Sequence, residues 1–151
     1  MCIFCKLLLK DDDPSFILHL NGGTLFVNYS QTYLGRVMYV CNKHLTDISD
    51  LADEDDWWTE QLSRDMRMIL KVLKTSFNCD RIDIASLGNE VPHLHFHLIP
   101  RYINEPNFLD PPWPHKKKII SKDEQVKLAE SFRNSFLKIW PDYKYESIET
   151  V

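Results

Sequence analysis

The sequence predicts an α+β domain built on an antiparallel sheet of about five strands with two main helices. Three observations predict this class. Short β-prone runs lie on both sides of a long helical segment, a second helical segment follows a proline-rich stretch, and histidines alternate with apolar residues over 93–97. The 151 residues, 44% hydrophobic and 26% charged, fit one domain (1–151) that can bury a core without disulfides.

Three strands are expected in the N-terminal part of the chain. Residues 16–20 and 24–28 are β-prone runs on either side of Asn21-Gly22-Gly23, which is a strong hairpin turn. A third run, 36–40, follows Gly35.

The first helix is expected from about residue 51 to residue 77. Its first turns are acidic at 53–56, which suits a helix N-terminus. Apolar side chains then recur at roughly helical spacing and predict the buried stripe: Trp58, Leu62, Ile69, Leu73 and Phe77.

Two further strands are expected at 81–87 and 94–100, joined by a loop at 88–92. Successive side chains of a strand point to opposite faces. His93, His95 and His97 should therefore share one face, and the alternate apolar side chains should be buried on the other: Leu94, Phe96 and Leu98.

The C-terminal part, 103–151, combines a proline-rich loop with the second helix. Ser121 and Glu124 form a capping-box pattern at its start. Pro141 is expected to end it.

Composition narrows the function classes. A net charge of −4 gives no support to nucleic-acid binding, and the single basic run, 116–118, is expected to be a solvated loop. No apolar stretch reaches the ~18 residues of a membrane span, and no secretory signal is visible. We therefore expect a soluble, cytoplasmic protein without membrane partners, whose cysteines are thiols or metal ligands.

Three interpretations of the histidine row compete. The histidines can be structural, which three residues in register make the weakest interpretation. They can form a catalytic metal site, because alternating histidines on one strand can hold zinc or iron. One imidazole can also be a nucleophile that its neighbours orient. The spacing alone does not separate the last two.

The wider sequence adds a resemblance. Residues 88–102 resemble the signature of the histidine triad family of nucleotide hydrolases and transferases, in which three histidines alternate with apolar residues. Residues 26–44 resemble the nucleoside-binding segment of that family, and 2–5 resemble its common start. The resemblance covers most of 1–102 and implies a HIT-like fold, with 103–151 as a looser C-terminal extension.

The resemblance assigns roles to the three histidines. His95 matches the nucleophile that attacks the α-phosphorus of a nucleotide and forms a covalent nucleotidyl-histidine. His97 matches the residue that contacts the phosphate oxygens, and His93 completes the triad.

Substrate-binding positions follow from the same resemblance. Phe26 and Asn28 lie in the nucleoside-binding segment, where Asn28 matches a position that is often aspartate and binds the ribose hydroxyls. Asn89 matches a polar position facing the bridging oxygen. Glu90 departs from the pattern, because several members carry a serine there.

The cysteine pair gains meaning from this context. Cys2 and Cys5 alone are a weak signal, since small buried hydrophobic residues give the same pattern. Some bacterial members resemble this chain and hold zinc with two cysteines and two histidines, which here would be Cys2, Cys5, His44 and His93. Four such ligands make a closed, structural site.

The sequence therefore predicts a nucleotide hydrolase or transferase that cleaves a phosphoanhydride or phosphoramidate bond at an α-phosphate. Diadenosine polyphosphates, with magnesium as an accompanying ion, are the first expectation, and nucleoside phosphoramidates are the second. A metal-dependent hydrolase and a non-catalytic nucleotide-binding module remain as alternatives. The resemblance also implies a homodimer.

Overall fold

The computed structural model describes residues 1–145. In chain order the elements are α1 (Ile3–Leu7), β1 (Phe16–His19), β2 (Gly23–Val27), β3 (Val37–Cys41), the 3-10 helix η1 (Ile48–Asp53), α2 (Asp56–Ser76), β4 (Arg81–Ala85), β5 (His95–Arg101) and α3 (Lys122–Ile139). Within these residues, no helix is both long enough and apolar enough to cross a membrane.

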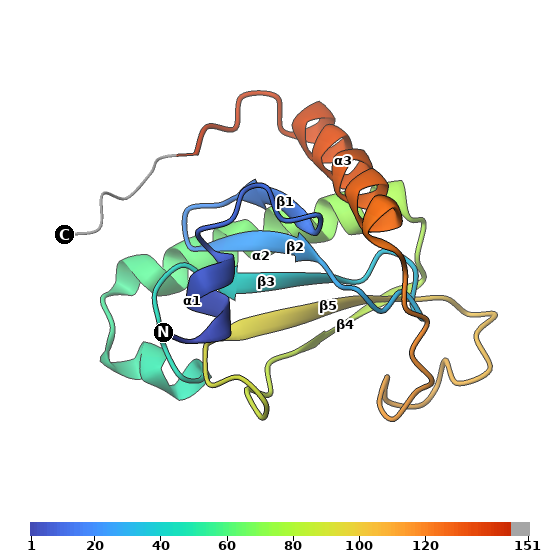
Figure 1. Cartoon of the computed structure of the whole chain (residues 1–151), viewed down its shortest axis with the longest axis horizontal. Helices are drawn as coiled ribbons and strands as arrows, with labels where there is room; N and C mark the ends of the chain where they lie inside the picture. Colours follow the sequence, from blue (N-terminus) through green and yellow to red (C-terminus); the bar gives the residue numbers. More distant parts are fainter. Residues whose placement is uncertain (146–151) are drawn as a thin grey trace.

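The strands form one antiparallel sheet in the order β1-β2-β3-β5-β4 (Figure 1). This confirms the predicted α+β class. The hairpin turn joins β1 to β2, and β5 is inserted between β3 and β4, so the strand with the alternating histidines has a paired neighbour on each side.

The sheet register places the histidines on a defined face. Met38 of β3 is paired with both Phe26 of β2 and His97 of β5, and Val40 is paired with His95. Directly paired residues point to the same face of a sheet. His95 and His97 therefore share a face with Met38, Val40 and Phe26.

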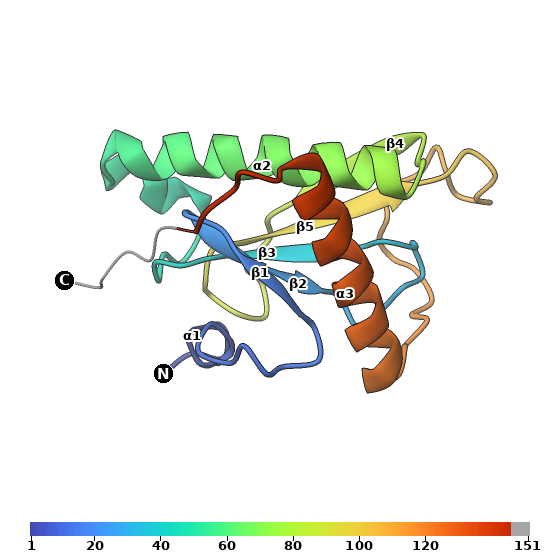
Figure 2. The same cartoon turned by 90° about the horizontal axis from the view of Figure 1, so that it is seen from above.

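The opposite face carries the main core. Figure 2 shows α2 along one side of the sheet and α1 on the other. Leu94, Phe96 and Leu98 are buried in the core, as the alternation predicts, together with side chains of α2 and α3: Met68, Ile69, Val72, Leu73, Ala129, Phe132 and Phe136.

A buried polar network ties the hairpin turn to α2. The hydroxyl of Tyr39 and the backbone N–H of Gly22 both donate to Oδ2 of Asp65, at 2.6 and 2.9 Å. Asp65 is 1% exposed. Burial raises the pKa of its carboxyl to about 6, although these hydrogen bonds act in the opposite direction.

The second helix begins as predicted. The Ser121 hydroxyl accepts from the N–H of Glu124, and the Glu124 carboxylate accepts from the N–H of Ser121, which completes a capping box. The helix ends at Ile139, two residues before Pro141.

Three details differ from the sequence expectations. The first long helix begins at Asp56 rather than near residue 51, because residues 48–53 form the 3-10 helix η1. β5 begins at His95, so His93 lies just before the strand, where its N–H donates to the carbonyl of Val91. The five-residue helix α1 was not predicted, since it is too short for apolar periodicity to reveal it.

Candidate functional site

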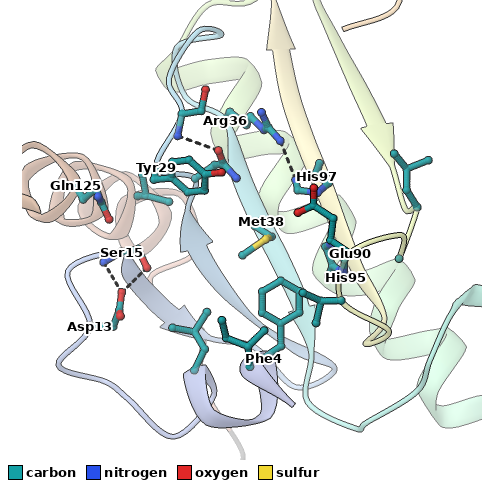
Figure 3. Close-up of a pocket in the computed structure, with 18 of the residues that line it drawn as sticks. Phe4, Asp13, Ser15, Tyr29, Arg36, Met38, Glu90, His95, His97 and Gln125 are labelled. Carbon is teal, nitrogen blue, oxygen red and sulfur yellow. Dashed lines mark hydrogen bonds between the residues drawn. The ribbon is translucent and has the colours of Figure 1, made fainter. Parts of the chain in front are cut away.

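A pocket of about 730 Å³ opens on the histidine face of the sheet. Helix α1, the segment 27–30, the loop 87–91 and the proline-rich segment all contribute to its wall. His95 and His97 lie in it with Arg36 and Met38, and Phe4 of α1 is close to His95 (Figure 3).

One ring nitrogen of His95 is held by a hydrogen bond to the backbone. Its Nδ1 lies 2.7 Å from the carbonyl oxygen of His93. A carbonyl oxygen can only accept, so Nδ1 must carry the proton. The lone pair of a neutral imidazole is then on Nε2. The residue is 8% exposed, and its ring packs edge-to-face against Phe4, with ring centroids 4.8 Å apart.

His97 is held in the opposite tautomer. Nη2 of Arg36 lies 3.2 Å from Nδ1 of His97. A guanidinium can only donate, so Nδ1 of His97 must accept and the ring proton of the neutral imidazole is on Nε2. Burial, with the positive charge of Arg36 and the proximity of His95, lowers the pKa of His97 to about 3. The pocket thus holds one imidazole with a basic Nε2 and one with a donating Nε2–H.

Cys2, Cys5, His44 and His93 are brought together beside this pocket. The six separations among the two Sγ and two Nδ1 atoms run from 3.1 to 3.6 Å. A tetrahedral zinc ion with Zn–S near 2.3 Å and Zn–N near 2.0 Å separates its ligand atoms by about 3.3–3.8 Å. The four atoms therefore form the donor set and nearly the geometry of a closed zinc site.

The other ring nitrogen of His93 supports the same interpretation. Its Nε2 lies 2.8 Å from the carbonyl oxygen of Cys41, which must accept the Nε2 proton and leaves Nδ1 unprotonated toward the two thiols. Metal-binding histidines are commonly oriented in this way by a backbone carbonyl. Burial lowers the pKa of His93 and favours the neutral ring that a metal needs, despite the opposing effect of this hydrogen bond.

Helix α1 connects the cluster to the pocket. Cys2 caps the helix by accepting from the N–H of Cys5, and Phe4 lies between these two residues in the sequence. The ring of Phe4 contacts both His93 and His95. Any ion that fixes Cys2 and Cys5 would therefore also fix one wall of the pocket.

Of the predicted substrate-binding residues outside the histidine row, two line the pocket and one does not. Asn28 and Asn89 line the pocket. Asn28 is buried, and its Oδ1 accepts from the N–H of Ser30, whereas Asn89 is exposed. Phe26 shares the histidine face but is 0% exposed and not among the lining residues, and the ring of Phe16 lies edge-to-face beside it. Its side chain therefore does not reach the pocket surface in this structure.

Sequence reasoning missed Arg36, Trp113 and Phe4 as pocket residues. Arg36 directly precedes β3 and is two residues from Met38, so a charge at the start of the apolar run expected at 36–40 was a usable signal for the histidine face. Trp113 packs against both His97 and Arg36 from the irregular proline-rich segment, where no periodicity could have placed it.

Comparison with known sequences gives a family match. The model of the HIT domain family matches residues 10–104. The adenosine 5'-monophosphoramidase of Saccharomyces cerevisiae is 27% identical over 122 residues, which cover 80% of this chain and 75% of the yeast protein.

Solved structures share the fold. A hypothetical histidine triad nucleotide-binding protein from Sulfolobus tokodaii superposes with a TM-score of 0.73 at 18% identity, over 96% of this chain and 100% of the other. A zinc-bound histidine triad family protein from Mycobacterium smegmatis gives 0.69 at 15% identity, over 94% and 97%. The diadenosine triphosphate hydrolase of Plasmodium falciparum gives 0.65 at 18% identity, over 85% and 79%.

Proposed function

Because the chain belongs to the HIT domain family, we propose that His95 is the nucleophile of a nucleotide hydrolase that acts at an α-phosphate. One observation carries this proposal: the hydrogen bond from Nδ1 of His95 to the carbonyl of His93, which leaves the lone pair on Nε2. A neutral imidazole in this tautomer is ready to attack an electrophilic phosphorus without prior loss of a proton.

The proposed reaction has two steps. Nε2 of His95 forms a bond to the α-phosphorus, and the bond from phosphorus to the bridging oxygen breaks, with its electron pair leaving on that oxygen. Water then attacks the phosphorus, and the P–N bond breaks with its electron pair returning to Nε2. One proton of the water is released to solvent, and the products are a nucleoside monophosphate and the leaving phosphate compound.

His97 has a supporting role in this scheme. Its Nε2–H is a neutral donor on the same face of the sheet, with its ring centroid 5.1 Å from that of His95. A donor at this place can stabilise the charge that grows on the phosphate oxygens in the transition state.

The proton on His97 supports one substrate class over another. An amine leaving group needs a proton to depart, whereas a phosphate oxygen can leave as an anion. Nδ1 of His97 accepts a hydrogen bond from Arg36, so the neutral ring carries its single proton on Nε2. If His97 gave this proton to a leaving group, the imidazole would become an anion. We therefore favour diadenosine polyphosphates as substrates, with magnesium as their accompanying ion. The fold shared with the diadenosine triphosphate hydrolase of P. falciparum supports this choice.

Nucleoside phosphoramidates are the second candidate, and the yeast phosphoramidase supports them, since it is the more similar of the two in sequence. Glu90 lines the pocket and offers a carboxylate that an amine could contact.

We further propose that Cys2, Cys5, His44 and His93 hold a structural zinc ion. Their donor atoms fit a tetrahedral site, and a zinc-bound protein from M. smegmatis shares the fold. The ion would fix α1 and His93, with no part in the chemical steps.

Two expectations from the sequence are retained as proposals. The first is a homodimer, which the sheet edge at β4 with its exposed Ile84 supports. The second is a cytoplasmic location.

A substrate screen tests the proposed function. Diadenosine triphosphate, diadenosine tetraphosphate and adenosine phosphoramidate are each incubated with the protein, and AMP release is followed by chromatography. We expect AMP from the diadenosine polyphosphates, at a higher rate than from the phosphoramidate. Absence of AMP from every substrate would contradict the proposal, and faster release from the phosphoramidate would replace the substrate class.

A further inference from the structure

Among the described residues, 1–145, Arg36 is a buried cation without a carboxylate partner. Its side chain lines the pocket, the residue is 6% exposed, and its Nη2 donates to His97. Its Nε is buried, and within residues 1–145 it has no hydrogen-bond partner. No ion pair to Arg36 occurs in the same part of the chain.

A second buried arginine shows how this chain satisfies a structural guanidinium. Arg101 is fully buried and forms ion pairs with Asp83 at 2.6 Å and with Glu105 at 2.8 Å. It also donates to the carbonyl oxygens of Asn107 and Asp110. Arg36 is almost as deeply buried, but the part of the chain that the structure describes offers it no comparable set of acceptors.

The missing partner has an energetic consequence. A buried charge without a counter-ion is costly, and burial accordingly lowers the pKa of Arg36. Trp113 lies 5.3 Å from the guanidinium carbon, and this cation–π contact offsets only part of the cost. An anion bound in the pocket would supply the charge that the protein does not.

The position of Arg36 indicates which anion. Figure 3 shows the guanidinium directed at His97, which lies next to His95. A phosphate chain whose α-phosphorus is at Nε2 of His95 would extend along this row. Guanidinium groups are suited to phosphate, because their planar N–H groups can contact two oxygens at once.

We propose that Arg36 is a phosphate-binding residue of this pocket and that it also holds the proton of His97 on Nε2. The phosphate-binding role rests on the proposed nucleotide function. The effect on the proton of His97 concerns the protein without ligand. One residue would thereby connect recognition of the phosphate chain to the donor that faces it.

The binding test compares AMP with adenosine by isothermal titration calorimetry. Arg36→Met should weaken AMP binding about ten- to a hundredfold, the range for loss of a charge-assisted hydrogen bond, and should leave adenosine binding unchanged. Arg36→Lys keeps the charge and should fall between Arg36→Met and the wild type. Arg67→Met is the matched control, because Arg67 also lies 5.3 Å from a tryptophan ring, that of Trp140, but outside the pocket.

The tautomer test uses long-range ¹H–¹⁵N NMR spectra of the imidazoles. In the wild-type protein at pH 7, His97 should show an unprotonated Nδ1 and a protonated Nε2. In Arg36→Met, His97 should lose this single tautomer. Because the wild-type spectrum alone tests the assignment, the test remains decisive if a variant fails to fold.

The outcomes separate this proposal from the proposed function. A wild-type protein that binds neither AMP nor adenosine would contradict the proposed function and the phosphate role of Arg36, while the tautomer result would still stand. Binding of AMP by Arg36→Met with wild-type affinity would overturn the phosphate role alone. A proton on Nδ1 of His97 in the wild type would overturn the claim that Arg36 holds the proton of His97 on Nε2.

Discussion

Nδ1 of His95 donates a hydrogen bond to the carbonyl oxygen of His93 over 2.7 Å. The same His93 directs its own Nδ1 into the cluster with Cys2, Cys5 and His44. The backbone of one residue therefore orients the proposed nucleophile, and its side chain belongs to the proposed zinc site. This link explains why the proposed zinc site and the pocket lie side by side without sharing a reacting atom.

The proposed zinc site gives a direct prediction. Cys2→Ser and Cys5→Ser should reduce bound zinc from about one ion per chain to near none and should lower the Tm, because a structural zinc ion stabilises the folded state. Metal content is measured by mass spectrometry after purification. Cys79→Ser is the control, since Cys79 is outside the cluster. Equal zinc content in all four proteins would contradict the assignment.

The pKa of His97 predicts how stability depends on pH. Its value of about 3 in the folded protein lies below the ordinary 6.5, so the unfolded chain binds more protons between these values. The contribution of His97 to the free energy of unfolding is thus complete above pH 6.5 and is lost as the pH falls toward 3. Urea unfolding of the wild type and of His97→Gln at pH 7 and pH 5 measures it. The wild type should lose more stability than the variant, and parallel losses would refute the shift.

Asp65 predicts a dependence of the opposite sign. Its pKa is raised to about 6 from 3.8, so the folded state holds the proton more tightly and stability is lost as the pH rises through 6. Asp65→Asn cannot ionise, and one amide oxygen can accept both donors, because Tyr39 and Gly22 both reach Oδ2. The stability of the variant relative to the wild type should increase by about 2 kcal/mol between pH 4 and pH 8.

Chemical denaturation at the two pH values tests this prediction. Asp12→Asn, in an exposed loop, serves as the control and should not change the pH dependence. A constant difference between Asp65→Asn and the wild type would show that Asp65 ionises normally.

Much of the sheet could be predicted from the chain because alternation is a local property. Leu94, Phe96 and Leu98 had to be buried together if residues 94–100 formed a strand, and they are. The same logic put His95 and His97 on the other face, where the pocket lies. The hairpin turn and the capping box at Ser121 are also local signals, and both were found where predicted.

The parts that escaped prediction depend on contacts between distant segments. Helix α1 has no buried residues of its own, and its cysteines meet His44 and His93 only in the folded chain. Phe26 packs beside Phe16 of the neighbouring strand and does not reach the pocket surface. Trp113 reaches His97 from a loop without periodicity. Such contacts have no signature within a short window of sequence.

The covalent intermediate tests the central claim most directly. The protein is mixed rapidly with diadenosine tetraphosphate, quenched in base, where a phosphorus–imidazole bond survives, and analysed by peptide mass spectrometry. We predict an adenylyl group on His95 in the wild type, and neither adduct nor AMP release in His95→Ala, which should remain folded. His19→Ala, outside the pocket, should behave as the wild type. AMP release by His95→Ala, or an adduct on another residue, would contradict the account.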